Sequence, residues 1–324
     1  MNRLPSFLLY VLAAMAAGMA TACAQAWPDR PVRILVGYPP GGGTDLVARL
    51  VQQPLSQKWN QPIVIDNRPG ANAIIATEAV AKAKPDGYTL LMAYATEIAL
   101  NPVTVKNLPY DPVRSFTPIM QLASAPLVLA VNPSVAAKDV RELVALAKAK
   151  PGTLAYSSSG SGSVHHFAGE LFKLQTGADI LHVPYKGSGP AAADAVAGQV
   201  QVNFASVASV LRFVQAGRLR ALAVTSKKRS PQMPEVPSMV EAGLADFELT
   251  SWYGLLAPAG TPADIVAKIH ADVSAVLASA ELQKSFGTQG LDMAGGTPQA
   301  FAEFIRGEAA KFARIAKAGN ISAE

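Results

Sequence analysis

The chain has 324 residues, of which 50% are hydrophobic and 16% charged, a composition typical of a folded globular protein. This length accommodates one large or two medium domains with real cores, so disulfides and structural metals are unnecessary. The net charge is +5, but no basic run exceeds the three residues from Lys227 to Arg229, which argues against a nucleic-acid-binding face. The mild positive excess suits a small anionic ligand or an exported basic protein.

Residues 1–26 have the pattern of a secretory signal peptide. Arg3 is their only charge, an apolar stretch follows at 7–17, and small residues lead to Ala26. The apolar stretch is shorter than the roughly 20 residues that a membrane-spanning helix needs, although an N-terminal anchor remains the alternative. We therefore expect export to the periplasm.

Cleavage of this segment is expected just before Gln25 or Trp27. Another outcome is lipidation of Cys23, although lipoprotein signals usually carry Leu where Ala20 stands. If cleavage removes Cys23, the single cysteine of the chain, the mature protein contains none.

Two stretches of the remaining chain share one order of elements: strand, Gly-rich loop, helix, strand, Gly turn, helix, strand. Apolar runs predict the strands, and Leu46, Leu50 and Leu55 are among the apolar positions that predict the first helix. The first stretch consists of strand 32–38, loop 39–44, helix 45–59, strand 63–66, turn 67–70, a helix through 83, turn 85–87 and strand 88–93. The second consists of strand 153–157, loop 158–162, helix 163–175, strand 180–184, turn 185–189, a helix through 197 and strand 200–204.

Strands that alternate with helices at this spacing predict parallel sheets covered by helices, and two such units predict two lobes. Ligands of open α/β sheets bind at the carboxyl ends of the strands. Two such edges that face each other across a hinge would enclose a cleft, where small-molecule sites are often found. The predicted fold class is therefore α/β, with a ligand cleft between two sheets covered by helices.

The other segments are predicted to connect and cover these lobes. The Pro-punctuated apolar segment 116–133 is expected to cross between the lobes, and 251–258 is expected to return. Two amphipathic helices, 265–280 and 298–318, are expected to pack back on the first lobe. The predicted lobes are 27–122 with 234–324, and 123–233.

The two Gly-rich loops have the chemistry of anion capture. Successive backbone N–H groups in such a loop can converge on an oxygen ligand at a helix N-terminus, and Thr44 and Ser163 add hydroxyl donors. For either loop alone, a plain tight turn is an equal alternative, and the pairing of two loops favours the site. Asp45 is expected to cap the first helix and orient its loop without touching ligand.

Catalytic and nucleotide motifs are missing from the sequence. It contains no G-x-G-x-x-G, GK[ST], H-E-x-x-H or G-x-S-x-G pattern. His165 and His166 are adjacent, so they would point about 100° apart on a helix, and packing or capping of the Ser-rich loop is favoured over metal binding for His166. We expect no metal, no cofactor and no catalytic residue.

Seven short motifs follow one another along the chain: YPPGGGTD at 38–45, DNRPGA at 66–71, PDGYTL at 85–90, LPYDP at 108–112, HVPYKG at 182–187, ALAVTS at 221–226 and WYGLLAP at 252–258. Together they resemble the Bug (TctC-type) family, the periplasmic substrate-binding proteins of tripartite tricarboxylate transporters. The resemblance implies a two-lobed type II periplasmic binding protein, a Venus flytrap that closes on a small carboxylate. It also implies a set of ligand contacts: Tyr38, Gly42, Gly43, Thr44, Ala71, Asn72, Ala73, Ser159, Gly160, Ser163, His166, Lys186, Gly187 and Ser206.

The sequence departs from the family pattern at several of these positions. Asn72 and Ala73 stand where the family usually has two glycines, Ala76 replaces a later glycine, and Ala205 replaces an acidic residue. Glu97 stands where small or hydroxyl residues are more usual. We expect Glu97 to be a solvated loop charge; if it faced the cleft, it would disfavour a second anionic group and favour an amine or hydroxyl.

The sequence therefore predicts a monomeric, non-enzymatic solute-binding protein that delivers a small organic carboxylate to a tripartite tricarboxylate-type transporter. One alternative is a ligand-presenting subunit for a membrane sensor kinase. Another is an enzyme with a binding-protein-like fold.

Overall fold

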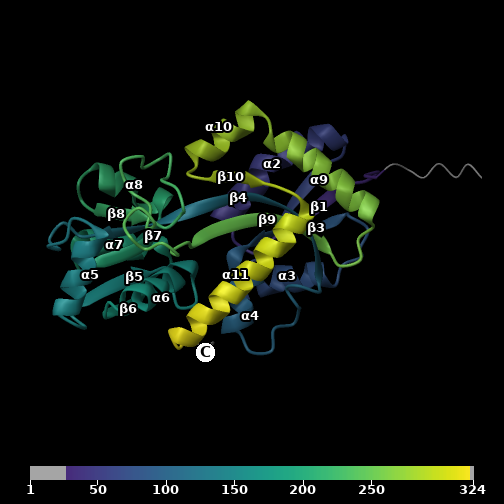
Figure 1. Cartoon of the computed structure of the whole chain (residues 1–324). Coiled ribbons are helices and arrows are strands. Elements are labelled where there is room, and N and C mark those ends of the chain that lie inside the picture. The colour runs from purple at the N-terminus through teal and green to yellow at the C-terminus, as the bar shows by residue number, and fades with distance from the viewer. Residues whose placement is uncertain (1–26, 322–324) are drawn as a thin grey trace, which may run out of the picture.

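Two parallel β-α-β units form the two ends of the molecule (Figure 1), in a computed structural model that describes residues 27–321. The predicted signal peptide and Cys23 lie outside the described residues. The first unit, here called lobe 1, contains β1 (Val32–Val36), α2 (Gly43–Trp59), β2 (Ile63–Asn67), α3 (Ile74–Ala81) and β3 (Thr89–Tyr94). Strand β1 lies between β2 and β3 and is parallel to both.

The apolar run of β1 is explained by its central place in the sheet. Ile34 and Val36 pack in one core with side chains of α2, whereas Leu35 packs in another core with side chains of α3. All three side chains are at most 1% exposed. A parallel strand that is covered on both faces is apolar at almost every position, so β1 carries no alternation of polar and apolar residues.

The second unit, lobe 2, repeats this arrangement. It contains β5 (Leu154–Ser158), α6 (Val164–Thr176), β6 (Ile180–Pro184), α7 (Ser188–Ala197) and β7 (Val202–Ser206). Strand β5 lies between β6 and β7 and is parallel to both. The predicted order of elements is confirmed in both units, although β7 begins two residues later than expected.

A single 16-residue strand, β4 (Phe116–Val131), runs through both lobes. Its first part pairs with β9 (Thr250–Pro258) and β10 (Asp292–Gly295), and its last five residues pair with β7 and β8 (Arg220–Val224). All four pairings are antiparallel, as is that of β3 with β9. The predicted parallel pairing is therefore confirmed within each unit, but the crossing strands add antiparallel pairs that were not predicted, because the strands that enter and leave lobe 2 lie side by side and run in opposite directions.

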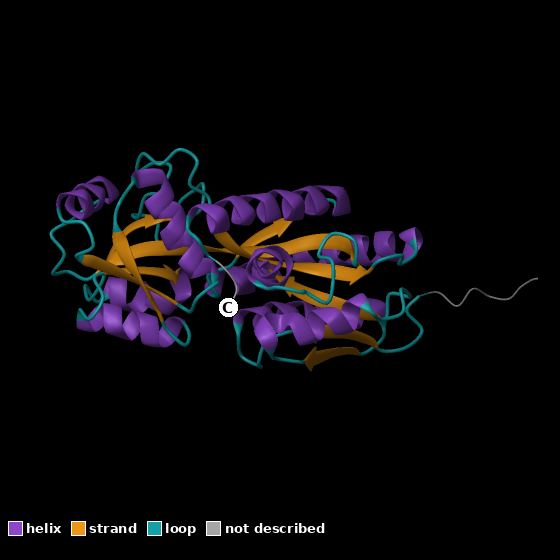
Figure 2. Cartoon of the chain, turned by 90° about the horizontal axis from the view of Figure 1, so that it is seen from below, coloured by secondary structure: helices purple, strands orange, loops and turns teal. Residues whose placement is uncertain are grey.

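The remaining elements cover the sheets or carry the loops (Figure 2). They are η1 (Ala71–Ala73), the π-helix η2 (Thr96–Leu100), α4 (Asn101–Thr104), α5 (Val140–Ala149), α8 (Val207–Gln215), α9 (Ala263–Leu277), α10 (Ala280–Thr288) and α11 (Pro298–Ala318). The predicted helix 265–280 is wrong at its end. Helix α9 stops at Leu277, and the Ser279 side chain accepts a hydrogen bond from the N–H of Leu282 to begin α10.

Helix α11 crosses the middle of the molecule and packs on both lobes (Figure 1). Near its start, the ring of Phe301 lies 5.7 Å from that of Trp252 on β9. Further along, Phe312 meets Phe167 of α6 edge to face, with ring centroids 5.1 Å apart. The predicted packing of 298–318 on the first lobe is therefore confirmed but incomplete, because the apolar face of a 21-residue helix is long enough to cover both lobes.

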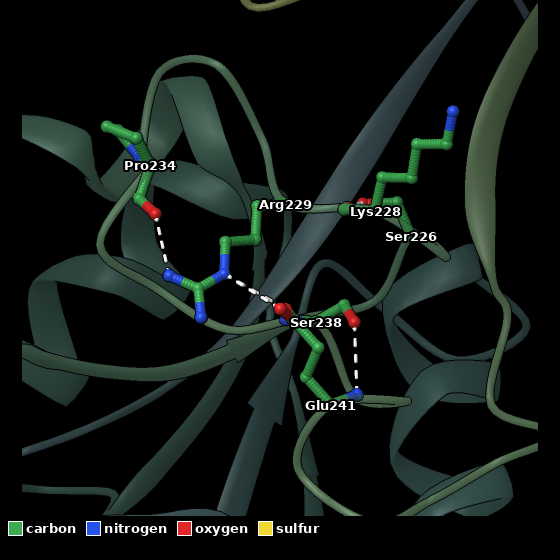
Figure 3. Close-up of polar contacts among 6 residues, drawn as sticks. All are labelled: Ser226, Lys228, Arg229, Pro234, Ser238 and Glu241. Carbon is green, nitrogen blue, oxygen red and sulfur yellow. Dashed lines mark hydrogen bonds and ion pairs between the residues drawn. The ribbon is translucent and has the colours of Figure 1, made fainter.

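Two of the three basic residues at 227–229 pair with carboxylates in the loop between β8 and β9. Figure 3 shows Arg229, whose Nε lies 3.0 Å from both carboxylate oxygens of Glu241 and whose Nη1 donates to the carbonyl of Pro234. Lys227 pairs with Glu248 at 3.0 Å. Within residues 27–321, Lys228 is therefore the one residue of this run without an ion pair.

We expect Phe312→Ala to lower the free energy of unfolding by about 3 to 5 kcal/mol, because it removes a fully buried ring that joins α11 to α6. Urea unfolding followed by circular dichroism measures the change. Arg314→Ala, on the exposed face of α11, should stay within about 0.5 kcal/mol of the unmodified protein. A loss below about 1 kcal/mol for Phe312→Ala would contradict the role of α11 as a brace between lobes.

Candidate functional site

The first Gly-rich loop leads directly into the N-terminus of α2. The N-cap is Gly42, whose extended backbone (φ −79°, ψ 168°) starts the helix without any side chain to accept an N–H of the first turn. The first N–H groups of a helix lack partners within the helix. This end of α2 therefore presents Gly43 and Thr44 N–H groups and the positive end of a 17-residue helix dipole.

The side chain of Asp45 stabilises the conformation of the first Gly-rich loop through hydrogen bonds. Its Oδ2 accepts hydrogen bonds from the Gly41 N–H at 2.9 Å and from Arg49 Nε at 2.8 Å, and its Oδ1 accepts one from Asn67 at 2.9 Å. Burial alone would raise the pKa of Asp45, but these hydrogen bonds outweigh it and lower the pKa. The prediction that Asp45 orients the loop is confirmed by the bond to Gly41. The prediction that it caps the helix is wrong, because Gly42 is the N-cap and no side chain accepts an N–H of the first turn.

The hydroxyl of Tyr253 lies against the first turn of α2. A Cβ atom placed on Gly43 would come within 2.5 Å of Tyr253 Oη, so only glycine leaves room for the phenol there. Tyr253 is 7% exposed, and within residues 27–321 its hydroxyl makes no hydrogen bond. A largely buried tyrosine thus places an unpartnered hydroxyl beside an uncapped helix N-terminus. The motif WYGLLAP contained this residue, but nothing local in it indicated a contact with a loop 210 positions away.

Three tyrosines form a row beside this turn. The ring of Tyr94, at the end of β3, lies 5.7 Å from that of Tyr38 and 5.1 Å from that of Tyr253. The Tyr94 hydroxyl is 2.8 Å from Ser251 Oγ on β9. The row therefore gives the site an aromatic wall built from three separate parts of the chain.

Glu97 is completely buried behind that wall. Its Oε2 accepts a hydrogen bond from Tyr38 Oη at 2.8 Å, and its Oε1 accepts one from the Tyr94 N–H at 2.6 Å. Burial raises the pKa of Glu97 to about 8. The prediction of a solvated loop charge is wrong, because the π-helix η2 turns this side chain inward.

Residues 71–73 form a left-handed turn between β2 and α3 of lobe 1. Ala71, Asn72 and Ala73 have φ angles of 47°, 52° and 69°, a conformation that costs a non-glycine residue roughly 1 to 2 kcal/mol. Ala73 packs directly on Gly37, since a Cβ atom placed on Gly37 would lie 2.2 Å from the Ala73 Cβ. The Asn72 carbonyl accepts a hydrogen bond from the Asn101 side chain, which also holds the turn in place. Strain of this kind is typical of functional sites.

The second Gly-rich loop is closed by its own side chains. Ser163 caps α6 by accepting the His166 N–H, and its hydroxyl donates to the Gly160 carbonyl at 2.6 Å. Nδ1 of His166 accepts the Gly162 N–H at 3.1 Å. The prediction that His166 caps this loop is confirmed, and through these hydrogen bonds both side chains shape the loop.

Three histidines support the second loop. Ser159 Oγ lies 2.7 Å from His165 Nδ1, and Ser158 Oγ lies 2.7 Å from His182 Nε2. The rings of His166 and His182 stack with centroids 3.8 Å apart. Burial lowers the pKa of each histidine to about 4, so all three are neutral at neutral pH. His182 escaped the sequence prediction, because only the tertiary structure brings β6 beside α6.

The other predicted residues of lobe 2 lie at the carboxyl edge of its sheet. Gly187 donates its N–H to the Ser159 carbonyl at 3.1 Å, Lys186 is exposed beside it, and Ser206 is the N-cap of α8. A Cβ on Gly162 would lie 3.8 Å from the Thr104 side chain of α4, so the second loop touches lobe 1 there.

An α/β chain of two lobes, with a Gly-rich loop at the carboxyl edge of each sheet, has the architecture of a periplasmic solute-binding protein. The family model of the tripartite tricarboxylate transporter family receptor, TctC, matches residues 47–321, and the chain belongs to this family. The predicted resemblance and fold class are thereby confirmed.

Relatives of the chain include both curated sequences and solved structures. Protein BugT of Bordetella pertussis is 36% identical over 299 residues, which cover 92% of each chain. The structure of R. palustris Rpa4515 with adipate is 36% identical with a TM-score of 0.79, and covers 92% of this chain and 100% of that one. MatC from Rhodopseudomonas palustris with bound malate is 30% identical with a TM-score of 0.74, and covers 89% of this chain and 99% of that one.

We expect His165→Asn to reduce the loss of stability in acid. His165 has a pKa of about 4 when folded and about 6.5 when unfolded, so between these values the unfolded chain binds more protons and the fold loses stability as the pH falls. One such group contributes up to about 1.4 kcal/mol per pH unit in that window. Urea unfolding from pH 7 to pH 4.5 measures the difference between variant and unmodified protein. A difference that does not change with pH would contradict a neutral buried His165.

Proposed function

We propose that this chain is an exported solute-binding protein that captures a small organic carboxylate between its lobes and delivers it to a tripartite tricarboxylate-type membrane transporter. The observation that carries the proposal is the hydroxyl of the largely buried Tyr253, which has no partner within residues 27–321 and lies beside the uncapped N-terminus of α2. A helix N-terminus attracts negative charge through both its free N–H groups and its dipole. A carboxylate oxygen satisfies these N–H groups and the phenol proton together.

Lobe 1 supplies the direct anion contacts in this proposal. Gly42 and Gly43 allow close approach of the ligand to the backbone, and Thr44 lies in the same turn. The strained residues 71–73 line the neighbouring strand end. Adipate and malate in the two structural relatives support a small carboxylate as the ligand class.

Lobe 2 supplies a rigid backbone surface that closes over the ligand. Ser163 and His166 act through the shape of the loop, because each already bonds to a backbone group. The contacts proposed for the ligand itself are Ser159, Gly160, Lys186, Gly187 and Ser206. Their places at the carboxyl ends of β5, β6 and β7 support this assignment.

The geometry of the Ser–His pairs favours binding over catalysis. His165 Nδ1 meets the Ser159 hydroxyl, but its Nε2 is buried without a partner, so no carboxylate orients the ring. The TctC family and its fold are those of binding proteins.

Export and the lobe limits are part of the proposal. Among residues 27–321, no helix is both long enough and apolar enough to cross the bilayer. We propose a periplasmic monomer in which 27–122 with 234–324 and 123–233 form the lobes, released by cleavage near Gln25 or Trp27. N-terminal sequencing of the periplasmic form tests this, and a lipid on Cys23 would contradict it.

A cognate carboxylate should raise the melting temperature, because it binds only the folded state. At a hundredfold excess over its Kd, the stabilisation should be about 2.7 kcal/mol. Differential scanning fluorimetry with di-, tri- and hydroxycarboxylates, amino acids and aromatic acids measures it. The carboxylate proposal is wrong if none of these acids shifts the melt while nucleotides or metal ions do.

Gly43→Ala and Tyr253→Phe should each weaken binding of the identified carboxylate at least roughly tenfold. The first drives a methyl group against the phenol, and the second removes a charge-assisted hydrogen bond worth about 1.5 to 3 kcal/mol. Gly160→Val should do the same from lobe 2, because its φ of 138° excludes a branched residue. Gly287→Ala, which meets open space in α10, is the matched control.

Calorimetry separates these cases once circular dichroism shows that each variant is folded. Loss of affinity only in lobe 1 variants would mean that lobe 2 merely covers the ligand. Unchanged affinity in all three folded variants would overturn the site.

A further inference from the structure

Glu97 is a carboxyl group without a cation. It is 0% exposed, and within residues 27–321 it forms no ion pair. Its two oxygens accept hydrogen bonds from the Tyr38 hydroxyl, at 2.8 Å, and from the Tyr94 N–H, at 2.6 Å, and the carboxyl group also meets its own backbone N–H. Burying an ionised carboxylate without a counter-charge costs free energy, so burial favours the protonated form of Glu97.

The proton in the Glu97–Tyr38 hydrogen bond can come from either group. Its source decides whether the Tyr38 hydroxyl can donate to a ligand or only accept from one. When Glu97 is ionised, the phenol donates its proton inward, and its oxygen can only accept from outside. When Glu97 is protonated, the acid donates to the phenol oxygen, and the phenol proton is free to point outward. Oε1 accepts the Tyr94 N–H in both states, so the carboxyl group need not move.

We propose that the Glu97–Tyr38 pair is a specificity switch in the ligand site. With Glu97 ionised, Tyr38 accepts a hydrogen bond from a hydroxyl or amine on the ligand. With Glu97 protonated, Tyr38 donates to a second carboxylate. This inference rests on the proposed function, because it requires a ligand in contact with Tyr38, which is partly exposed at the carboxyl end of β1.

Glu97 is the carboxyl group that titrates in this cluster, because its titratable neighbours are phenols. The titratable groups that face it are the phenols of Tyr38, Tyr94 from β3, Tyr253 from β9 and Tyr110, whose hydroxyl donates to the Glu97 carbonyl at 2.7 Å. The packed elements η1 and α4 carry no titratable residue. Helix α11 also packs on η2, but none of its charged side chains bonds to Glu97 within the described chain.

The proton balance makes selection depend on pH. Capture of a carboxylate against Tyr38 requires one proton on Glu97, taken from solvent, and capture of an ammonium group, which can only donate, requires its release. High pH should therefore favour an acid that carries an ammonium group over the matched acid without it. Low pH should remove this preference.

Two probe pairs test the switch: aspartate against succinate, and alanine against propionate. Calorimetry at about pH 6 and about pH 9 should show the ratio of affinities for the amino acid over the plain acid rising at least roughly tenfold with pH. In Glu97→Gln the amide donates to the Tyr38 oxygen, so the ratio should stay at its low-pH value at both pH values. Tyr38→Phe should abolish the pH dependence. Glu78→Gln, which removes a partly exposed carboxylate of lobe 1, should behave like the unmodified protein.

A ligand-free measurement separates this inference from the proposed function. Infrared spectroscopy of the unliganded protein should show a protonated carboxyl band at about pH 6 that disappears by about pH 9.5 and is missing in Glu97→Gln. Absence of this band, or the same pH-dependent ratio in Glu97→Gln, would overturn the switch. If the band titrates but no probe binds at either pH, the carboxylate function is wrong and Glu97 selects no ligand.

Discussion

The structure depends on the pairing of β4 with β9 between the lobes. These strands run antiparallel from Phe116 opposite Pro258 to Pro126 opposite Thr250, and β4 then continues into the sheet of lobe 2. Because one strand belongs to both sheets, its direction fixes how each lobe is placed. Helix α11 adds a second connection, with Phe301 on one side and Phe312 on the other. Any motion that opens the lobes must bend these few elements.

The site is built where regular structure ends. Parallel strands bring their carboxyl ends to one edge, so the loops after β1, β2 and β3 meet although they are distant in sequence. Each loop then departs from ordinary geometry: α2 starts without a side-chain cap, residues 71–73 are left-handed, and η2 is a π-helix. Such departures lower stability locally, and they leave backbone groups and buried side chains available to a ligand.

The two lobes contribute in physically different ways. Lobe 1 holds groups whose hydrogen-bonding capacity is open or reversible, namely the Tyr253 hydroxyl and the Glu97–Tyr38 pair. In lobe 2 the side chains of Ser163, His166 and His182 are already bonded within the loop. In the proposed function, lobe 1 therefore carries the chemistry that distinguishes ligands, and lobe 2 carries the surface that covers them.

The order of the elements, the two Gly-rich loops, the orienting role of Asp45 and the family could all be predicted from the sequence. These follow from local signals: apolar runs, glycine turns and short motifs, each confined to a few neighbouring residues. Only the tertiary structure decided that Glu97 is buried, that Tyr253 lies on Gly43, and that α11 packs on both lobes. Each of these depends on contacts between segments far apart in the chain. Local periodicity shows which side of an element is apolar, but it does not identify the distant segment against which that side packs.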